Sequence, residues 1–347
     1  MISSSPSVPP TFAEGFVSQM RFLPEAEAAV SEWLKSGGAD LLRHRTLLLA
    51  GIGASYAVLG TPVYELRSGG VSAVRTDCSD MPENTPSLAD AYIVVSQSGR
   101  SRETSQLVLD NPAAHTLAIT NAVDSPLRAV ARDALSVGGF PDSRVSTIGF
   151  SATLVALGML AEELGGVVAE TSWASLPSMI EGVLDGAENA LVDFAGAVAA
   201  AAEIDVVATA SQITSAEQGA LLFREGPLVP STAMGTRAYL HGPMDCAGRS
   251  TSHLLFGGAR EGLLAEQLAQ QKAPILLVTD TDVTAPASII RMPRGLTSSQ
   301  RSLLEVILAQ RLVTLVGEIS GVSVDSTVFT RLDTKVDSAA EVRVSRV

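Results

Sequence analysis

Serine and threonine residues gather in one short stretch, residues 92–104, which reads YIVVSQSGRSRET. Its apolar, β-branched start predicts a strand, and residues 103–109 favour a helix. The first turn of a helix has unpaired backbone N–H groups, and together with the helix dipole these attract an anion. The hydroxyl groups of the loop add further donors and belong to Ser96, Ser98, Ser101 and Thr104. The stretch therefore has the composition of a phosphate cradle.

On these residues alone, two interpretations of the stretch stay open. A serine-rich turn that only caps a helix uses the same chemistry without a ligand. The stretch has neither the Gly-Lys-Ser/Thr ending of a Walker loop nor the spaced glycines of a dinucleotide fingerprint. The two cysteines, Cys78 and Cys246, and the four histidines show no metal-ligand spacing. We therefore expect neither a cofactor nor a metal.

The composition limits the classes of protein that fit. The chain has 347 residues, 46% of them hydrophobic, which is enough for two domains with full cores. Its net charge of −13 argues against nucleic acid or anionic membrane as a partner, because both require a basic surface. The chain starts without a signal-peptide pattern, and no apolar stretch is expected to span a bilayer. With so few cysteines, we expect a cytoplasmic protein.

Predicted strands and helices alternate through the first half of the chain. Apolar residues at helical spacing over residues 12–34 predict a helix that Pro24 interrupts or restarts. A glycine turn at residues 51–55 opens a helix through Leu66. Right-handed crossovers place such strands in a parallel sheet that binds ligands at its carboxyl edge, where the glycine turn and the serine loop would both lie. The predicted strands are residues 47–50, 72–75, 92–95, 116–120 and 134–137.

The same layout starts again about 160 residues later, with strands at residues 205–210, 253–256 and 275–279. Helical stretches over residues 150–164 and 178–202 separate the two copies. The second copy has GGARE at residues 257–261 in place of the serine loop, so only the first is expected to hold phosphate. The predicted division is an N-terminal segment 1–37, a first domain 38–165, a connector 166–194, a second domain 195–315 and a tail 316–347.

The chain resembles the sugar isomerase (SIS) family over residues 15–340. The resemblance rests on the duplicated layout and on the motifs SQSGRS, GIGASY, STIGFS and HGP. It is strongest to the isomerase half of glucosamine-6-phosphate synthase and to its stand-alone isomerase and deaminase relatives. The resemblance implies an α/β fold with two tandem SIS domains, each a three-layer αβα sandwich around a five-stranded, mostly parallel, flavodoxin-like sheet.

The resemblance also implies which residues bind the substrate. In the family, the serine loop holds the sugar 6-phosphate, the glycine turn contacts the sugar, and a Ser-Thr segment precedes the next helix. Here Ala54 and Ile148 replace a threonine and a lysine that are usual in the family. The residues carried over from these motifs are Ser55, Ser96, Gln97, Ser98, Ser101, Ser146 and Thr147.

Three residues are the catalytic candidates. Glu225 ends a segment that resembles the family's EGALKLKE motif, whose last glutamate moves a proton between C1 and C2 of the sugar. His241 follows sixteen residues later in a His-Gly-Pro turn, whose histidine assists ring opening. Aldose–ketose exchange needs a carboxylate and a group with a near-neutral pKa, and the glutamate and the histidine are residues of these two types. Lys335 is the one tail lysine that matches a synthase lysine able to reach the sugar carbonyl.

Taken singly, each of these residues has a simpler interpretation. Glu225 can be a helix-end carboxylate, His241 a turn histidine bonded to backbone, and Lys335 a solvated tail lysine. Taken together with the phosphate loop, Glu225 and His241 favour catalysis.

The sequence therefore predicts a phosphosugar isomerase acting on a hexose or hexosamine 6-phosphate, with deamination as a variant of the reaction. Ile2 stands where a glutamine-using synthase has its cysteine nucleophile, so we expect no glutaminase activity. We also expect a homodimer, in which His241 acts on the neighbouring subunit's sugar. A phosphosugar sensor without catalysis is the alternative. No helix-turn-helix or basic patch points to a DNA-binding regulator.

Overall fold

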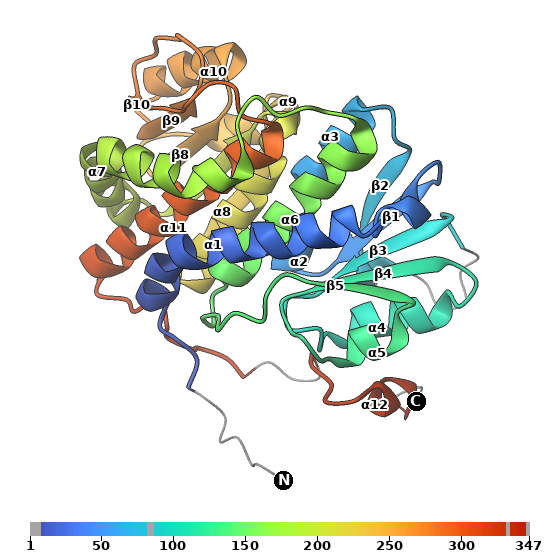
Figure 1. The fold of residues 1–347 in the computed structure, drawn as a ribbon. Coiled ribbons are helices and arrows are strands. Elements are labelled where there is room, and N and C mark those ends of the chain that lie inside the picture. Colours follow the sequence, from blue (N-terminus) through green and yellow to red (C-terminus); the bar gives the residue numbers. More distant parts are fainter. Residues whose placement is uncertain (1–7, 82–86, 331–333, 345–347) are drawn as a thin grey trace.

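Two five-stranded sheets, both fully parallel in the described strands, occupy the two halves of the molecule (Figure 1). The computed structural model describes residues 8–81, 87–330 and 334–344. The strand orders are β2-β1-β3-β4-β5 and β10-β9-β8-β6-β7, which is one topology used twice. The first sheet contains β1 (Leu47–Gly51), β2 (Ala73–Asp77), β3 (Ala91–Val95), β4 (His115–Thr120) and β5 (Asp133–Ser136). The second contains β6 (Glu203–Ala208), β7 (Ser231–Gly235), β8 (Thr251–Phe256), β9 (Ile275–Thr279) and β10 (Ser288–Arg291).

Helices cover both faces of each sheet, so the predicted tandem αβα fold is confirmed. Every residue of β1 and β3 is buried, as expected for strands with helices on both sides. The helices of the first half are α1 (Phe12–Lys35), α2 (Ala54–Ala57), α3 (Gly60–Ser68), α4 (Arg102–Asp110), α5 (Pro126–Val130) and α6 (Ile148–Gly165). Those of the second half are α7 (Leu176–Ala200), α8 (Ile213–Glu225), α9 (Thr236–Tyr239), α10 (Ala259–Gln270), α11 (Ser298–Ser320) and α12 (Ala339–Val344).

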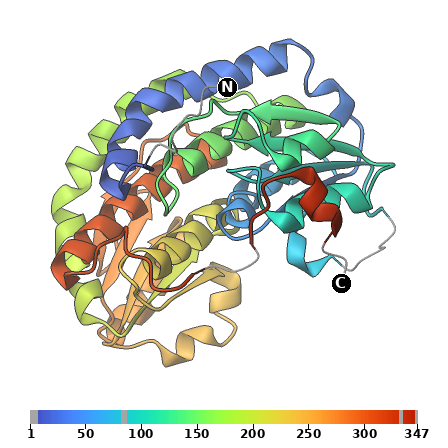
Figure 2. The same ribbon diagram turned by 90° about the horizontal axis from the view of Figure 1, so that it is seen from below.

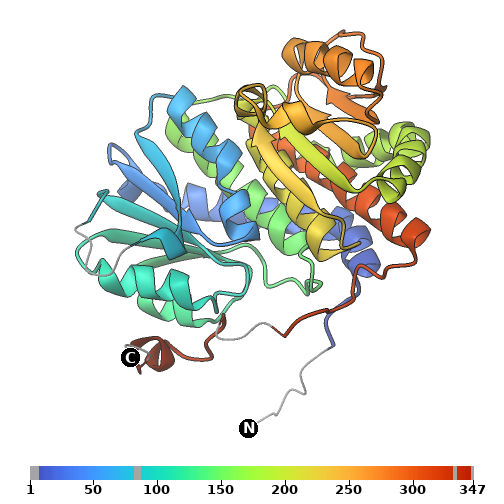
Figure 3. The same cartoon turned by 180° about the vertical axis from the view of Figure 1, so that it is seen from behind.

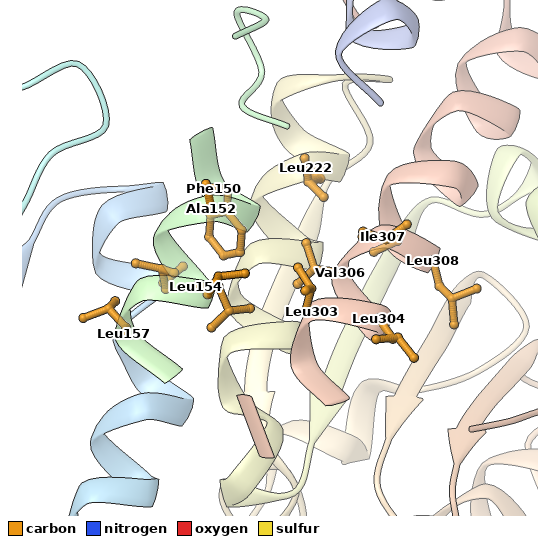
Figure 4. Close-up of a cluster of buried hydrophobic side chains, with 14 of the residues drawn as sticks. Phe150, Ala152, Leu154, Leu157, Leu222, Leu303, Leu304, Val306, Ile307 and Leu308 are labelled. Atoms are coloured by element: carbon orange, nitrogen blue, oxygen red, sulfur yellow. The ribbon is translucent and has the colours of Figure 1, made fainter. Parts of the chain in front are cut away.

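One continuous hydrophobic core joins the two halves. The outer face of the first sheet packs against α4 and α5, and that of the second against α10. The inner faces share a core with the helices between the sheets (Figure 3). Figure 4 shows its centre, where α6, α8 and α11 meet through side chains such as Leu154, Leu222 and Leu303. Because the halves share this core, residues at their junction keep fixed relative positions.

The N-terminal helix α1 corrects one prediction. It runs unbroken from Phe12 to Lys35 with Pro24 inside it, whereas the sequence predicted an interruption there. Proline in a helix interior costs about 3 kcal/mol, because a hydrogen bond is lost and the ring crowds the preceding turn. The buried residues on either side, Leu23 and Ala26, belong to the shared core, and α1 packs along α6. This packing outweighs the local cost.

Two further predictions need correction. The helix expected from the glycine turn through Leu66 is divided into α2 and α3. The expectation that no apolar stretch could span a bilayer is wrong by length and composition, because α6 has 18 residues and a mean hydropathy of 1.4. Of these residues, 78% are buried inside the fold, so α6 is the central helix of the core.

Polar contacts cross the junction between the halves. Gln19 of α1 accepts a hydrogen bond from Ser151 of α6 and donates one to Gln310 of α11 over 2.8 Å. Arg75 at the end of the first sheet makes a two-bond ion pair with Glu217 of α8, at 2.5 and 2.7 Å. These fully or partly buried contacts hold the two sheets at one angle and so fix the distance between their carboxyl edges.

Candidate functional site

The serine loop runs from the carboxyl end of β3 to the N-terminus of α4, as predicted. Ser96 is buried and donates a hydrogen bond to Ser101 Oγ over 3.3 Å. Ser101 is the N-cap residue of α4, but its side chain makes no capping hydrogen bond in the described part of the chain. The first-turn N–H groups of α4 therefore lack the side-chain cap that many helices have. This is the state that an anion-binding helix N-terminus requires.

The hydrogen bonds within the loop give the hydroxyls of Ser98 and Ser101 a fixed polarity. Ser98 Oγ accepts from the Arg100 backbone N–H and from Lys335 Nζ, both at 3.3 Å. Ser101 Oγ accepts from Ser96 and from Lys335 Nζ, the latter at 3.2 Å. A hydroxyl has two lone pairs and one proton, so each oxygen here has its acceptor capacity filled. Within the residues that the structure describes, neither hydroxyl has an acceptor for its proton, and a phosphate oxygen is an acceptor of the kind that would fit.

Gly99 allows the loop to turn this tightly. Its φ of +63° lies in the left-handed region, where a side chain is strained. A Cβ at this position would also lie only 2.1 Å from Ser125 Oγ. The loop is further fixed by the Leu127 backbone N–H, which donates to the Gly99 oxygen over 3.0 Å. The glycine of the SQSGRS motif is thus required by the backbone and by a close neighbour.

Gln97 links the serine loop to the Ser-Thr segment before α6. A Cβ at Gly149, in the first turn of α6, would lie 2.6 Å from Gln97 Cγ and 2.3 Å from Asp142 Oδ2. Asp142 accepts hydrogen bonds from Ser146 Oγ at 2.6 Å and from Thr147 Oγ1 at 3.1 Å. Burial raises the pKa of Asp142. Ser146 and Thr147 therefore bind one carboxyl group, and Gln97 and this carboxyl both lie next to Gly149.

Glu225 is tied to the same region by Arg144. Glu225 is the last residue of α8 and is partly buried. Arg144, two residues before Ser146, donates to the backbone oxygens of Glu225 and Val324, at 2.9 Å each. A residue from the first half of the chain thus holds the end of a helix of the second half. The Ser-Thr segment and Glu225 are consequently neighbours.

Ser55 and His241 are less closely connected to the loop. Ser55 lies in α2, which follows β1, and β1 is paired with β3, so α2 begins near the serine loop. His241 is exposed in the turn after α9, beyond the carboxyl end of β7. Among the described residues, no hydrogen bond or ion pair joins either side chain to the serine loop.

In the second half, a side chain of the chain itself caps the helix that follows β8. After β8, the chain enters α10 through Gly257 and Gly258. The Glu261 carboxylate, 2% exposed, accepts from the Gly258 N–H at 2.7 Å and from Thr236 Oγ1 at 2.6 Å. A carboxylate of the chain therefore caps the N-terminus of α10, whereas α4 has no side-chain cap among the described residues.

Two residues of the site were missed from the sequence. Asp142, followed by Ser146 and Thr147 just before a helix, fits the pattern of a helix start, and that signal was there to be read. Arg144 has no local signal, because its partners lie 81 and 180 residues away in the chain.

Solved structures with the same fold are numerous among known proteins. The C-terminal domain of glucosamine-fructose-6-phosphate aminotransferase from Francisella tularensis has a TM-score of 0.79 and 15% identity, covering 94% of this chain and 100% of that one. Glucosamine-6-phosphate deaminase from Thermotoga maritima has a TM-score of 0.75 and 18% identity, with 92% and 98% covered. Tagatose-6-phosphate ketose/aldose isomerase from Escherichia coli has a TM-score of 0.73 and 15% identity, with 94% and 100% covered.

The sequence itself matches no protein-family model, and no curated protein is significantly similar to it. At these identities the structural likeness concerns the fold. It extends over nearly the whole chain and includes both sheets. The resemblance predicted from the motifs is thus confirmed for the architecture: this chain has the tandem SIS-domain fold shared by phosphosugar isomerases.

Proposed function

We propose that this protein is a cytoplasmic phosphosugar isomerase that interconverts the aldose and ketose forms of a hexose or hexosamine 6-phosphate. With an aminosugar, hydrolytic release of ammonia would follow. The proposal rests on the convergence of the Ser98 and Ser101 hydroxyls and the Lys335 ammonium group at the N-terminus of α4. Outward O–H donors and a positive charge suit a phosphate group better than a neutral ligand.

Glu225 is the residue that we propose moves the carbon-bound proton. Isomerisation needs a carboxylate that takes a proton from one carbon and returns it to the next. Glu225 is joined through Arg144 to the Ser-Thr segment, which meets the serine loop at Gln97. A six-carbon sugar held at the loop by its phosphate would extend its other end toward this region, where Ser55, Ser146 and Thr147 are the proposed sugar contacts.

We further propose that His241 opens the sugar ring in the neighbouring subunit of a homodimer. Its exposure supports this role, because an exposed side chain is available to a second copy. Sedimentation of the pure protein at micromolar concentration should give the mass of a dimer. A fully active monomer would rule out the role in trans.

A binding protein without catalysis is the second candidate. It is favoured by the hydroxyls of Ser146 and Thr147, which are already hydrogen bonded to Asp142. It is also favoured by Ala54 and Ile148, which supply no polar group at positions where the SIS family usually has a threonine and a lysine. Such a protein would bind the same phosphosugars as the isomerase and differ only in chemistry.

The Glu225→Gln variant separates the two candidates. Glutamine keeps the size and hydrogen-bonding reach of the side chain but cannot accept the carbon-bound proton. Exchange of that proton in deuterated water, followed by NMR with a bound hexose 6-phosphate, should therefore slow by about 10²–10⁴-fold. Affinity for the sugar should change little.

The matched control is Glu266→Gln, which alters an exposed glutamate on α10 and should exchange at the wild-type rate. If wild type exchanges no proton with any hexose or hexosamine 6-phosphate that it binds, the protein is the binding protein. If Glu225→Gln exchanges as fast as wild type, another residue is the base.

A further inference from the structure

The described part of the C-terminal tail lies against the serine loop. In Figure 2 the tail and α12 lie beside the domain that carries α4 and α5, and α12 contacts both helices. Val336 and Val342 of the tail are each 1% exposed, so the tail is anchored by apolar contacts. An isolated antiparallel bridge pairs Lys335 with Ser101. The backbone of the tail is therefore aligned with the start of α4.

The arginines of the loop hold the tail. Arg100 donates from Nε to the Val336 oxygen at 3.3 Å and forms an ion pair with Asp337. In return, the Val336 N–H donates to the Arg100 oxygen over 2.9 Å. Arg102 reaches the backbone oxygen of Glu341. Arginines in a serine-rich loop are common partners of phosphate. Here the two guanidinium groups contact the tail.

The tail in turn brings its own cation to the hydroxyls. Lys335 Nζ lies 3.3 Å from Ser98 Oγ and 3.2 Å from Ser101 Oγ. These two hydrogen bonds use an acceptor position on each oxygen, so neither hydroxyl donates its proton to the lysine. A phosphate that accepts these two protons would lie within reach of the ammonium group.

We propose that Lys335 binds the phosphate of the ligand, and that it is not the carbonyl lysine expected from the sequence. The proposal rests on the phosphosugar function above. In a sugar 6-phosphate, the phosphate and the carbonyl are at opposite ends of a six-carbon chain, and Lys335 lies at the phosphate end. A phosphate monoester carries a charge of about −1.5 to −2 at pH 7. In a chain of net charge −13, one lysine at the loop offsets much of the repulsion that this ligand meets.

A ligand with a phosphate and no carbonyl tests the assignment. Glucitol 6-phosphate keeps the phosphate end of the sugar but has no aldehyde or ketone. Its affinity, measured by calorimetry, should fall about tenfold to a hundredfold in Lys335→Met and recover at least partly in Lys335→Arg. The variant should also lose part of the salt dependence of binding, because an ion pair is screened by salt.

Lys35→Met is the matched control, since it removes one exposed lysine from the end of α1 and should bind as wild type does. Unchanged glucitol 6-phosphate affinity in Lys335→Met, together with slower proton exchange on a hexose 6-phosphate, would overturn the inference and assign the lysine to the carbonyl. Lysine-dependent binding without proton exchange would support the inference while the isomerase proposal fails. No binding of glucitol 6-phosphate by wild type would overturn both.

Discussion

The helices that follow β3 and β8 begin at equivalent places in the two sheets, but their N-termini have opposite partners. At α4, two serine hydroxyls and Lys335 are arranged around a helix end without a side-chain cap. At α10, the buried Glu261 carboxylate accepts from Gly258 and Thr236. Both ends offer backbone donors to a negative charge. At α10 the chain itself supplies that charge, whereas at α4 we propose that it comes from a bound phosphate.

A third helix start extends the comparison across the domain junction. Glu65 of α3 accepts a hydrogen bond from the Ser299 N–H, in the first turn of α11, at 2.8 Å. Burial raises the pKa of Glu65 to about 7, despite its hydrogen bonds to Ser299. Desolvation therefore exceeds the benefit that a helix N-terminus gives to a carboxylate. A buried carboxylate that caps a helix therefore carries a desolvation cost. A helix N-terminus that is open to an anion from solution does not require the chain to bury a charge of its own.

Loss of the hydroxyls at α4 should have the largest effect. Each hydrogen bond to a charged group contributes about 1.5–3 kcal/mol, so the double variant Ser98→Ala/Ser101→Ala should bind a hexose 6-phosphate about two to four orders of magnitude more weakly. Thr281→Ala, which removes a hydroxyl beside Gly258 in the second half, should leave affinity unchanged. If calorimetry showed that both variants lost affinity equally, the proposed difference between the starts of α4 and α10 would be wrong.

The carboxylate at α11 should make stability depend on pH. The folded pKa of Glu65, about 7, lies above the ordinary value of 4.5, so the native state binds this proton more tightly than the unfolded chain does. Its contribution is complete below pH 4.5 and is lost as the pH rises through 7, by about 3 kcal/mol in total. Urea unfolding of Glu65→Gln should show a flatter pH profile over this range.

The neighbouring Glu162 contributes to this effect, because its charge adds to the rise in the Glu65 pKa. Burial raises the pKa of Glu162 as well. Glu162→Gln is therefore the comparison variant, and it should keep most of the slope that Glu65→Gln removes. Equal slopes in wild type and Glu65→Gln would show that the proton is bound elsewhere.

Removing the Glu261 carboxylate from the start of α10 should have the smallest effect of these changes. Glu261→Ala leaves the Gly258 N–H and Thr236 hydroxyl without their partner, which should cost about 1–3 kcal/mol in the free energy of unfolding. Inorganic phosphate should then raise the melting temperature of the variant more than that of wild type, because it can replace the lost carboxylate. Glu266→Ala on the exposed face of α10 is the control. If phosphate raised the melting temperature of wild type, Glu261→Ala and Glu266→Ala equally, the starts of α4 and α10 would not be equivalent anion sites.

Much of this arrangement could be predicted from the sequence, because it depends on local patterns. Apolar runs predicted the strands of the first sheet and β6, β8 and β9 of the second, and the repeat at about 160 residues predicted the second domain. The edge strands β7 and β10 were not predicted. The loop between Ser96 and Ser101 was located by its composition, and GGARE at residues 257–261 showed that the equivalent helix start in the second half has no serine loop. That only the first half holds phosphate stays a prediction.

What the sequence left out depends on contacts between distant residues. The continuity of α1 through Pro24 follows from packing against α6, which local propensity does not include. Arg144 finds its partners through the fold alone. The place of Lys335 at Ser98 and Ser101 is set by the arginines and valines that anchor the tail, and the spacing of residues along the chain gives no measure of that.

The hydrogen bond between Gln19 and Gln310 also bears on the order in which the protein folds during synthesis. Its two residues are separated by 291 positions, and the Lys335–Ser98 pair by 237. Helix α1 leaves the ribosome early but cannot complete its burial until α11 has been made. The serine loop likewise waits for residue 335 before its hydroxyls acquire their final polarity. A nascent chain that already contains the whole first sheet would therefore still lack the contacts that Lys335 makes with the serine loop.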